Sequence, residues 1–167
     1  DGDESTIVSY GPSSSNKYVT TYFRKNINIT SSYTDFDLNV KRDDGVVVYI
    51  NGVEVFRNNM PTGIITFTTL STTVASDDGG TAQSITLPAS AFVLGNNLIA
   101  VEIHQAGVSS SDLTFDLELN GNLVPLFTSI VKGPYLQKSS PTSILIKWET
   151  SSNTNSKVNF GLSASSL

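Results

Sequence analysis

Residues 43–57 read DDGVVVYINGVEVFR, and this stretch sets the expectation for the whole chain. The run Asp43-Asp44-Gly45 contains residues that accept the left-handed backbone of a tight hairpin turn. Residues 46–50 form a continuous apolar run, as in a strand that is buried on both faces. Asn51-Gly52 is a strong signal for a two-residue hairpin loop, and residues 53–56 return from it. The stretch therefore predicts two turns around a buried strand.

Alternation of apolar and polar residues continues on both sides of this stretch, whereas helical periodicity is nearly absent. In residues 18–29, for example, Phe23 and Ile27 would face one side, and Tyr22 and Arg24 the other. The further strands expected are 18–29, 35–42, 64–70, 84–87, 98–104 and 113–119. Short strands joined by Gly, Asn and Asp turns predict an all-β chain that begins with a jelly-roll sandwich.

The composition of the 167 residues excludes several classes of function. A net charge of −5 with scattered Lys and Arg argues against nucleic acid and against an anionic membrane surface as partners. The absence of cysteine excludes disulfides, thiolate metal sites and a cysteine nucleophile. No apolar run approaches the roughly 20 residues of a membrane-spanning helix. A surface rich in Ser, Thr and Asn and poor in Lys is common in exported bacterial β-proteins, so we expect a secreted or cell-surface protein.

The character of the sequence changes near residue 128. Gly133-Pro134 begins a new run, and Ile144, Ile146 and Trp148 alternate with other residues further along. A free-standing immunoglobulin-like sandwich needs about 100 residues, and far fewer follow this point. We therefore expect a jelly roll over residues 1–126, a linker at 127–133 and a truncated immunoglobulin- or fibronectin-like segment at 134–167.

His104 is the single histidine of the chain. A dinuclear metal centre needs several His and Asp ligands, and a Ser-His-Asp triad needs a serine held beside this one imidazole. No G-x-S-x-G nucleophile elbow occurs in the sequence. We therefore expect no catalytic residues, and a His104 that bonds to a neighbouring carboxylate or to loop backbone.

Alternation in residues 98–104 leaves two ionisable side chains opposite the apolar ones. If this strand pairs with residues 112–119 across a short loop, two aspartates join them on the same side. The predicted cluster consists of Glu102, His104, Asp112 and Asp116, with Arg24 as a candidate counter-ion. Two interpretations stay open: a polar-ligand or cation site, and a hydrogen-bonded network that fixes the hairpin, which we favour.

A sugar-binding surface needs an exposed aromatic ring beside planar hydrogen-bonding side chains, because pyranose faces are apolar and their rims carry hydroxyls. Residues of both kinds occur on the expected strands. The candidates are Tyr22, Tyr33 and Tyr49, together with Arg24, Asn26, Asp37 and Asn39. The alternative is that these tyrosines belong to the sandwich core and that their hydroxyls are hydrogen-bonded within the protein.

Calcium prefers carboxylate and carbonyl oxygens in loops. Asp1, Asp3 and Glu4 form one candidate site for a structural ion, and Asp77 with Asp78 forms another. Neither follows the spacing of a helix-loop-helix calcium site, and solvated acidic turns are the alternative. No other cofactor is expected.

Three segments together resemble a galactose-binding-domain-like jelly roll: DDGVVVYINGVEVFR at 43–57, GNNLIAVEIHQ at 95–105 and SSSDLTFDLEL at 109–119. Similar modules precede catalytic domains in secreted bacterial hydrolases and phosphoesterases, and sugar-binding domains of family 2 glycoside hydrolases share the looser pattern. The segment VKGPYLQKSSPTSILIKWETSSNTNSKVNFG at 131–161 resembles the start of the fibronectin-like domain of purple acid phosphatases.

The pairing of these resemblances implies the N-terminal region of a secreted bacterial calcineurin-like metallophosphoesterase. The metal-binding motifs of that family, rich in Asp, Asn and His, have no counterpart here, so no catalytic residue carries over. Such jelly rolls also usually begin with an earlier strand. We therefore expect a non-catalytic accessory module that positions a downstream catalytic domain and binds polysaccharide weakly. The alternative is a structural or adhesive surface protein that associates by β-strand addition, because an incomplete β-domain leaves unpaired strand edges.

Overall fold

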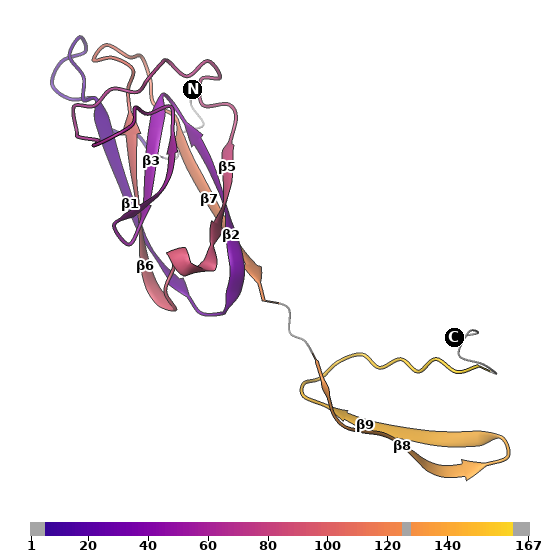
Figure 1. The fold of residues 1–167 in the computed structure, drawn as a ribbon. Coiled ribbons are helices and arrows are strands. Elements are labelled where there is room, and N and C mark those ends of the chain that lie inside the picture. The colour runs from indigo at the N-terminus through magenta and orange to yellow at the C-terminus, as the bar shows by residue number, and fades with distance from the viewer. Residues whose placement is uncertain (1–5, 125–127, 162–167) are drawn as a thin grey trace. The chain divides into compact units, whose positions relative to one another are not determined.

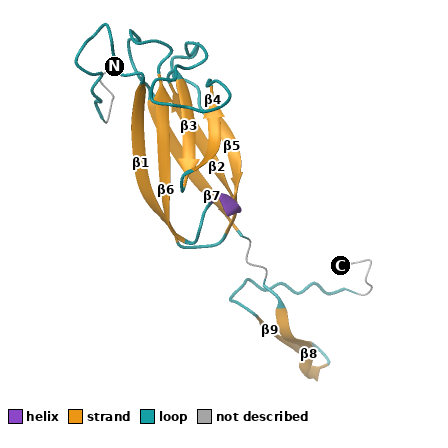
Figure 2. Cartoon of the chain, turned by 60° about the vertical axis from the view of Figure 1, so that its left-hand side comes forward, coloured by secondary structure: helices purple, strands orange, loops and turns teal. Residues whose placement is uncertain are grey.

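The structure, a computed structural model, describes residues 6–124 and 128–161. Its regular elements are strands apart from one short 3-10 helix, η1 (Ala89–Ala91), so the predicted all-β fold class is confirmed (Figure 2). In this part of the chain no helix has the length and apolar character that a membrane crossing requires. The chain divides into two compact units, Asp1–Val124 and Pro125–Leu167. The predicted boundary at residue 126 and the first linker residue lie outside the described residues.

The N-terminal unit is a sandwich of two antiparallel sheets (Figure 1). The four-stranded sheet has the strand order β1-β6-β3-β4, and the three-stranded sheet has the order β5-β2-β7. The strands are β1 (Thr20–Ile29), β2 (Tyr33–Arg42), β3 (Gly45–Ile50), β4 (Val53–Asn58), β5 (Gln83–Pro88), β6 (Gly95–His104) and β7 (Phe115–Leu123). Each sheet turns one face to the shared core and the other to solvent.

The core lies between the two sheets and is built from alternate residues of β2, β3 and β6. Its most buried members are Phe36, Leu38, Val40, Val46, Val48, Ile50, Ile99, Val101 and Ile103. Aromatic rings extend it, because Phe36 lies 4.2 Å from Phe92 and Phe23 lies 4.4 Å from Phe115 between ring centroids. The inward orientation predicted from the alternation of β6 is confirmed.

The Asn51-Gly52 hairpin is confirmed, and β3 pairs with β4 across it. Asn51 has φ 52° and Gly52 has φ 83°, the positive values that a two-residue hairpin loop of this kind requires. A second asparagine fastens the turn: the backbone N–H of Leu98 donates to Asn51 Oδ1 at 2.9 Å, and Asn51 Nδ2 donates to Asn97 Oδ1 at 2.8 Å. The turn is therefore bonded to the neighbouring strand as well as to itself.

The turn at Asp43-Asp44-Gly45 is not a hairpin, contrary to the prediction. β2 pairs with β5 and β7, whereas β3 pairs with β4 and β6 of the other sheet. The chain also crosses between the sheets through loops 59–82 and 105–114, and these two crossings lie with the Asp43-Asp44-Gly45 turn at one end of the sandwich, here called the crossover end (Figure 1). The β1–β2 and β5–β6 connections cross at the opposite end. A turn sequence specifies a reversal of direction but not the strand that pairs next. The same local pattern is therefore compatible with a hairpin and with a crossing to the other sheet.

The strand expected at 64–70 is also wrong, because these residues belong to loop 59–82. Threonine side chains close a local turn there: the backbone N–H of Thr66 donates to Thr69 Oγ1 at 2.9 Å. Side-chain bonds of this kind compete with a strand ladder. The loop is fastened to β1, since Thr20 Oγ1 donates to the Phe67 carbonyl at 2.9 Å.

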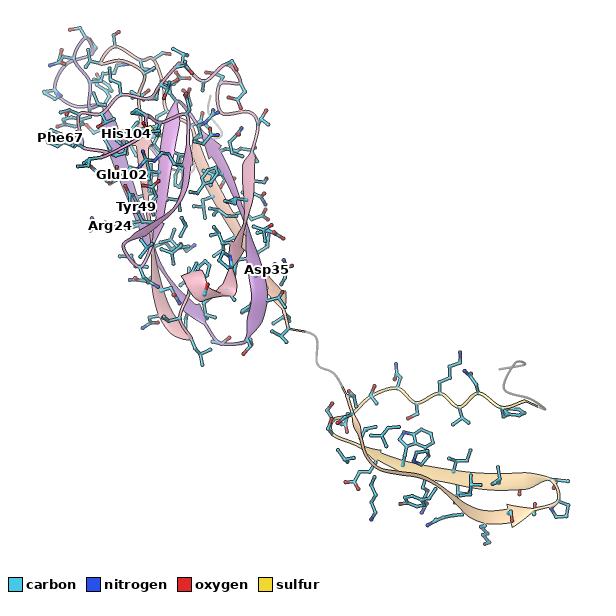
Figure 3. The ribbon with its side chains drawn as sticks, in the orientation of Figure 1. Arg24, Asp35, Tyr49, Phe67, Glu102 and His104 are labelled. Atoms are coloured by element: carbon cyan, nitrogen blue, oxygen red, sulfur yellow. The ribbon has the colours of Figure 1, made fainter. Side chains whose placement is uncertain are left out.

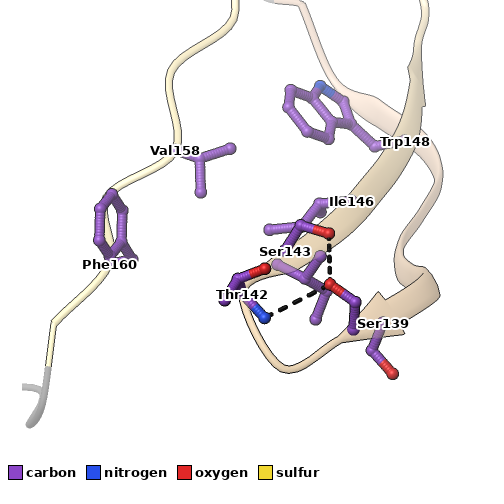
Figure 4. Close-up of a pocket in the computed structure, with 9 residues that line it drawn as sticks. Ser139, Thr142, Ser143, Ile146, Trp148, Val158 and Phe160 are labelled. Carbon is purple, nitrogen blue, oxygen red and sulfur yellow. Dashed lines mark hydrogen bonds between the residues drawn. The ribbon is translucent and has the colours of Figure 1, made fainter.

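The second unit contains an antiparallel hairpin of β8 (Ile130–Ser140) and β9 (Ser143–Thr150), followed by an extended segment. Ile146 and Trp148 lie on one face of β9, and Val158 and Phe160 of the extended segment stand across from it (Figure 4). The open hollow between them measures about 640 Å³. Phe160 is 91% exposed, so the hollow is an apolar face without a covering layer among the described residues rather than an enclosed binding pocket.

Candidate functional site

The outer face of the four-stranded sheet carries most of the predicted site residues. Strand register places Tyr22 opposite Glu102, and the next row brings Arg24 of β1, Ala100 of β6 and Tyr49 of β3 side by side. We call the set Tyr22, Arg24, Tyr49 and Glu102 the tyrosine face. Arg24, Tyr49 and Glu102, with Phe67 and His104 beyond them, follow one side of the sandwich (Figure 3). The alternation of β1, β3 and β6 thus collects residues that are far apart in the sequence.

The tyrosine face offers aromatic rings and unengaged polar groups together. Tyr22 is 52% exposed and Phe67 is 71% exposed, while Tyr49 is half-buried. Among the described residues, no hydrogen bond or ion pair uses the hydroxyls of Tyr22 and Tyr49 or the guanidinium of Arg24. These groups are therefore directed to solvent or to a ligand.

The tyrosine hydroxyls of this face are held in their neutral form. Burial, followed by the negative charge of Glu102, raises the pKa of Tyr22, and Arg24 opposes this shift. Burial and then Glu102 also raise the pKa of Tyr49. Both hydroxyls remain hydrogen-bond donors at neutral pH, as a ligand rich in hydroxyl oxygens requires.

His104 is fully buried and bonded through both ring nitrogens. Nδ1 lies 2.7 Å from the Thr69 carbonyl oxygen and 3.0 Å from Thr20 Oγ1, and Nε2 lies 3.0 Å from Glu102 Oε2. Each ring nitrogen therefore has a hydrogen-bond partner within the protein. The imidazole therefore fixes loop 59–82 to the sheet, and its buried nitrogens are directed to groups of the protein.

The outer face of the three-stranded sheet differs, because its polar groups bond to one another. Thr86 Oγ1 donates to Asp37 at 2.8 Å, and Ser84 Oγ donates to Asn39 at 2.6 Å. Asn39 in turn donates to Glu118 at 3.1 Å. This ladder of short polar side chains leaves few groups for a ligand. Asp37 and Asn39, predicted beside the tyrosines, belong to this face and not to the tyrosine face.

Asp112 and Asp116 do not join Glu102 and His104, contrary to the prediction. The expected pairing of β6 with β7 does not occur, since β6 pairs with β1 and β3 and β7 pairs with β2. Loop 105–114 crosses to the other sheet, and Asp116 lies opposite Lys41 on β2. The length of the loop permits either a hairpin or a crossing, so alternation alone could not place these two residues.

A second cluster lies at the crossover end. Carboxylate oxygens of Asp43, Asp78 and Asp112 all lie within 4.8 Å of one another, and Asp43 is only 3% exposed. Burial, followed by the neighbouring carboxylates, raises the pKa of Asp43 to about 7. Asp77, predicted to act with Asp78, instead pairs with Arg42 at 2.9 Å, and this bond lowers its pKa. The other candidate calcium ligands, Asp1, Asp3 and Glu4, lie outside the described residues.

Sequence reasoning missed the buried polar residues that hold the loops. Asp44 is 1% exposed, and its carboxylate accepts hydrogen bonds from the backbone N–H groups of Ala75 and Ala106, each at 2.7 Å. Asn97 is equally buried and bonds both the N–H and the carbonyl of Val93. Asp44 bonds residues more than 30 positions away, so a local pattern gives no signal for its role.

A further hollow of the N-terminal unit, of about 300 Å³, lies where Phe23 of β1 and Phe115 of β7 meet. Its apolar walls belong to the core, because these two rings pack against each other. Ligand pockets of this size normally carry a few convergent polar groups beside the apolar ones. Arg24, Lys25 and Asp116 also line this hollow, so charged side chains stand beside its apolar walls at the open side of the sandwich.

Comparison with known proteins gives no family assignment. No protein-family model matches the chain, and a search of curated proteins finds no match. A solved structure of Streptomyces avermitilis alpha-L-rhamnosidase complexed with L-rhamnose is similar at a TM-score of 0.40 and 15% sequence identity. The match covers 65% of this chain and 11% of the rhamnosidase chain. A similarity of this size does not identify a shared function.

Proposed function

We propose that the chain is a non-catalytic accessory module of a secreted metallophosphoesterase, and that it binds glycans weakly through the tyrosine face. The observation that carries the binding role is the exposed ring of Tyr22 beside Arg24 and Tyr49, whose polar groups no described residue engages. An aromatic ring stacks on the apolar face of a pyranose, and guanidinium and phenol groups bind its hydroxyls. The face therefore matches the chemistry of a sugar.

The openness of this face suits an extended polymer rather than an enclosed small molecule. Its residues lie in two rows of a sheet surface, and Arg24 also lines the hollow between β1 and β7 described above. A ligand on an open face stays partly solvated, so affinity per site is low. Weak binding is adequate for a module that keeps a tethered catalytic domain near an insoluble substrate.

The bonding of His104 supports the non-catalytic part of the proposal. Both ring nitrogens are engaged by Thr69, Thr20 and Glu102, and the side chain is fully buried. A general base must reach the proton that it removes. The metallophosphoesterase context comes from the sequence resemblance alone. This context can be tested in the parent protein. Deletion of residues 1–124 should lower its activity on a glycan-bound substrate and leave its activity on a soluble chromogenic ester unchanged.

The binding role makes a prediction about two tyrosines. Tyr22→Ala and Tyr49→Ala should each weaken binding, by about fivefold, to a polysaccharide that the unaltered chain retains, because each removes a stacking surface worth about 1 kcal/mol. Affinity electrophoresis in gels containing polysaccharides, followed by titration calorimetry, measures the change. Thr86→Ala on the opposite face is the matched control and should bind normally. The proposal would be contradicted if the unaltered chain bound no polysaccharide, or if the tyrosine variants bound as tightly as the unaltered chain.

A second candidate function is association by β-strand addition, and the second unit favours it. β8 and β9 form a two-stranded sheet, so each strand has an unpaired edge among the described residues. Leu136 is 68% exposed and Ile144 is 52% exposed. Unpaired edges and exposed apolar side chains are templates for another strand.

Size-exclusion chromatography with light scattering separates the two functions. An accessory module should elute as a monomer at micromolar and at higher concentrations. An adhesive protein that works by strand addition should form dimers or filaments as the concentration rises, since pairing is bimolecular. We expect the monomer. Growth of oligomers that a Leu136→Lys variant prevents would favour the adhesive function instead, because a charge on an exposed strand blocks edge pairing.

A further inference from the structure

Part of loop 59–82 lies against the outer face of the four-stranded sheet, at the crossover end. Alternation along β1 and β6 places Thr20 and His104 on this outer face, and the register pairs the two residues. Both bond to the loop. Thr20 Oγ1 donates to the Phe67 carbonyl at 2.9 Å, and His104 Nδ1 lies 2.7 Å from the Thr69 carbonyl oxygen. The loop therefore brings Phe67 to the end of the face on which the tyrosines lie.

The turn that carries Phe67 is held in one conformation by its own bonds. The N–H of Thr66 donates to Thr69 Oγ1, and the N–H of Thr69 donates to the Thr66 carbonyl, each at 2.9 Å. Further along the loop, the N–H of Ser71 donates to the Gln105 carbonyl at 3.1 Å. Because the backbone is fixed on both sides of Phe67, a ligand that contacts this residue does not have to order the loop first, and this lowers the entropy cost of binding.

The Phe67 ring is turned outward although its backbone is fixed. The residue is 71% exposed, and none of the close ring pairs within residues 6–124 includes it. It lies on the same side of the sandwich as Glu102 (Figure 3). Tyr22, which is 52% exposed, follows Thr20 by two positions on the same face of β1, a step of about 7 Å. Single exposed apolar residues are common, whereas exposed rings that gather on one surface are typical of a binding site.

We infer that Phe67 is a further stacking platform of the tyrosine face, and that this extended surface binds consecutive sugars of a neutral, linear β-glucan or xylan chain. The inference rests on the proposed glycan binding and adds the ligand class and a binding residue to it. Rings in a row along one strand each stack on a different sugar of an extended chain. Such a chain presents flat apolar faces in succession, and its hydroxyls accept hydrogen bonds from the phenol groups.

The charge of the surface favours a neutral chain over an acidic one. Glu102 lies within the tyrosine face, opposite Tyr22, and the whole chain has a net charge of −5. Both repel a polymer of uronic acids or sulfated sugars. Arg24 is the cation of this face, and its guanidinium group donates to hydroxyl oxygens as well as to anions. A neutral polysaccharide meets these groups without a repulsive charge.

Titration calorimetry of the whole chain with cellohexaose and xylohexaose, and with cellobiose and xylobiose, tests the inference. The unaltered chain should bind at least one hexasaccharide more tightly than the corresponding disaccharide, because only the longer chain reaches both Tyr22 and Phe67. Phe67→Ala should weaken binding of that hexasaccharide by about fivefold, since it removes a stacking surface worth about 1 kcal/mol. Binding of the disaccharide should change little, because Tyr22 and Arg24 remain. Tyr22→Ala should weaken binding of both.

Two further variants separate stacking from an effect on folding. Phe67→Tyr keeps an aromatic ring and should bind like the unaltered chain. Val74→Ala alters an apolar residue of the same loop that is 72% exposed, and it should also bind normally. The thermal midpoint of Phe67→Ala should equal that of the unaltered chain, because the exposed ring contributes little to the core.

The outcomes distinguish this inference from the proposed function. If Tyr22→Ala weakens hexasaccharide binding and Phe67→Ala does not, the role of Phe67 is overturned and glycan binding by the tyrosine face stands. An equal loss for disaccharide and hexasaccharide in Phe67→Ala would also overturn the extended surface. If the unaltered chain binds neither hexasaccharide, the ligand class is wrong, and retention in gels that contain other polysaccharides then decides the proposed function.

Discussion

Replacement of Asp44 by alanine should destabilise the N-terminal unit by about 3–5 kcal/mol, since two buried backbone N–H groups lose a charged acceptor at once. Ala75 N–H and Ala106 N–H each donate to this carboxylate at 2.7 Å, and the side chain is 1% exposed. Water cannot replace an acceptor at so buried a position. A loss of this size is a large share of the 5–15 kcal/mol that stabilises a typical domain.

Urea unfolding followed by far-ultraviolet circular dichroism, a signal that does not depend on tryptophan, measures this loss. Asp44→Asn retains one acceptor oxygen and should lose about half as much. Asp37→Asn, on the exposed ladder of the three-stranded sheet, should leave the midpoint almost unchanged. A midpoint for Asp44→Ala equal to that of the unaltered chain would show that the two loops are held by other contacts.

Replacement of Leu38 by alanine should cost about 3–4 kcal/mol, because it removes a fully buried side chain from the centre of β2 and leaves a cavity. The register of β2 places Ile85 of β5 and Leu119 of β7 on either side of Leu38, facing the same core. Ile85 is 36% exposed at the sheet edge, so Ile85→Ala should cost only about 1 kcal/mol.

Both variants can be compared by their urea midpoints, provided that the slope of the transition is the same. The two substitutions remove side chains of similar size from neighbouring positions of one sheet face. Their difference therefore reports burial rather than strand propensity. Equal losses for Leu38→Ala and Ile85→Ala would mean that the edge of the three-stranded sheet is covered in solution.

The elements that the sequence predicts correctly are those whose signals are local. Asn51-Gly52 needs only its own two residues to specify a hairpin, and Ile99, Val101 and Ile103 need only their alternation to face the core. The Asp43-Asp44-Gly45 turn was predicted as a hairpin because a reversal looks the same whether the next strand pairs locally or crosses to another sheet. Its true outcome depends on bonds from Asp44 to Ala75 and Ala106, which no local pattern contains.

The same distinction applies to the candidate site. Tyr22, Arg24 and Glu102 share one face because alternation along β1 and β6 is strict, and the structure brings Tyr49 to them through β3. Asp112 was predicted there from an assumed strand pair, and it lies instead with Asp43 and Asp78. Strand order is set by the packing of the whole core, so single-strand patterns locate faces but not neighbours.

The ladder of hydroxyl, amide and carboxylate groups on the three-stranded sheet determines how this sheet responds to dissolved salt. Partners such as Thr86 with Asp37 and Ser84 with Asn39 bond at contact distance and include few opposite charges. Dissolved salt weakens attractions between separated charges but has little influence on such short dipolar bonds. The stability that these bonds contribute should therefore change little when salt is added.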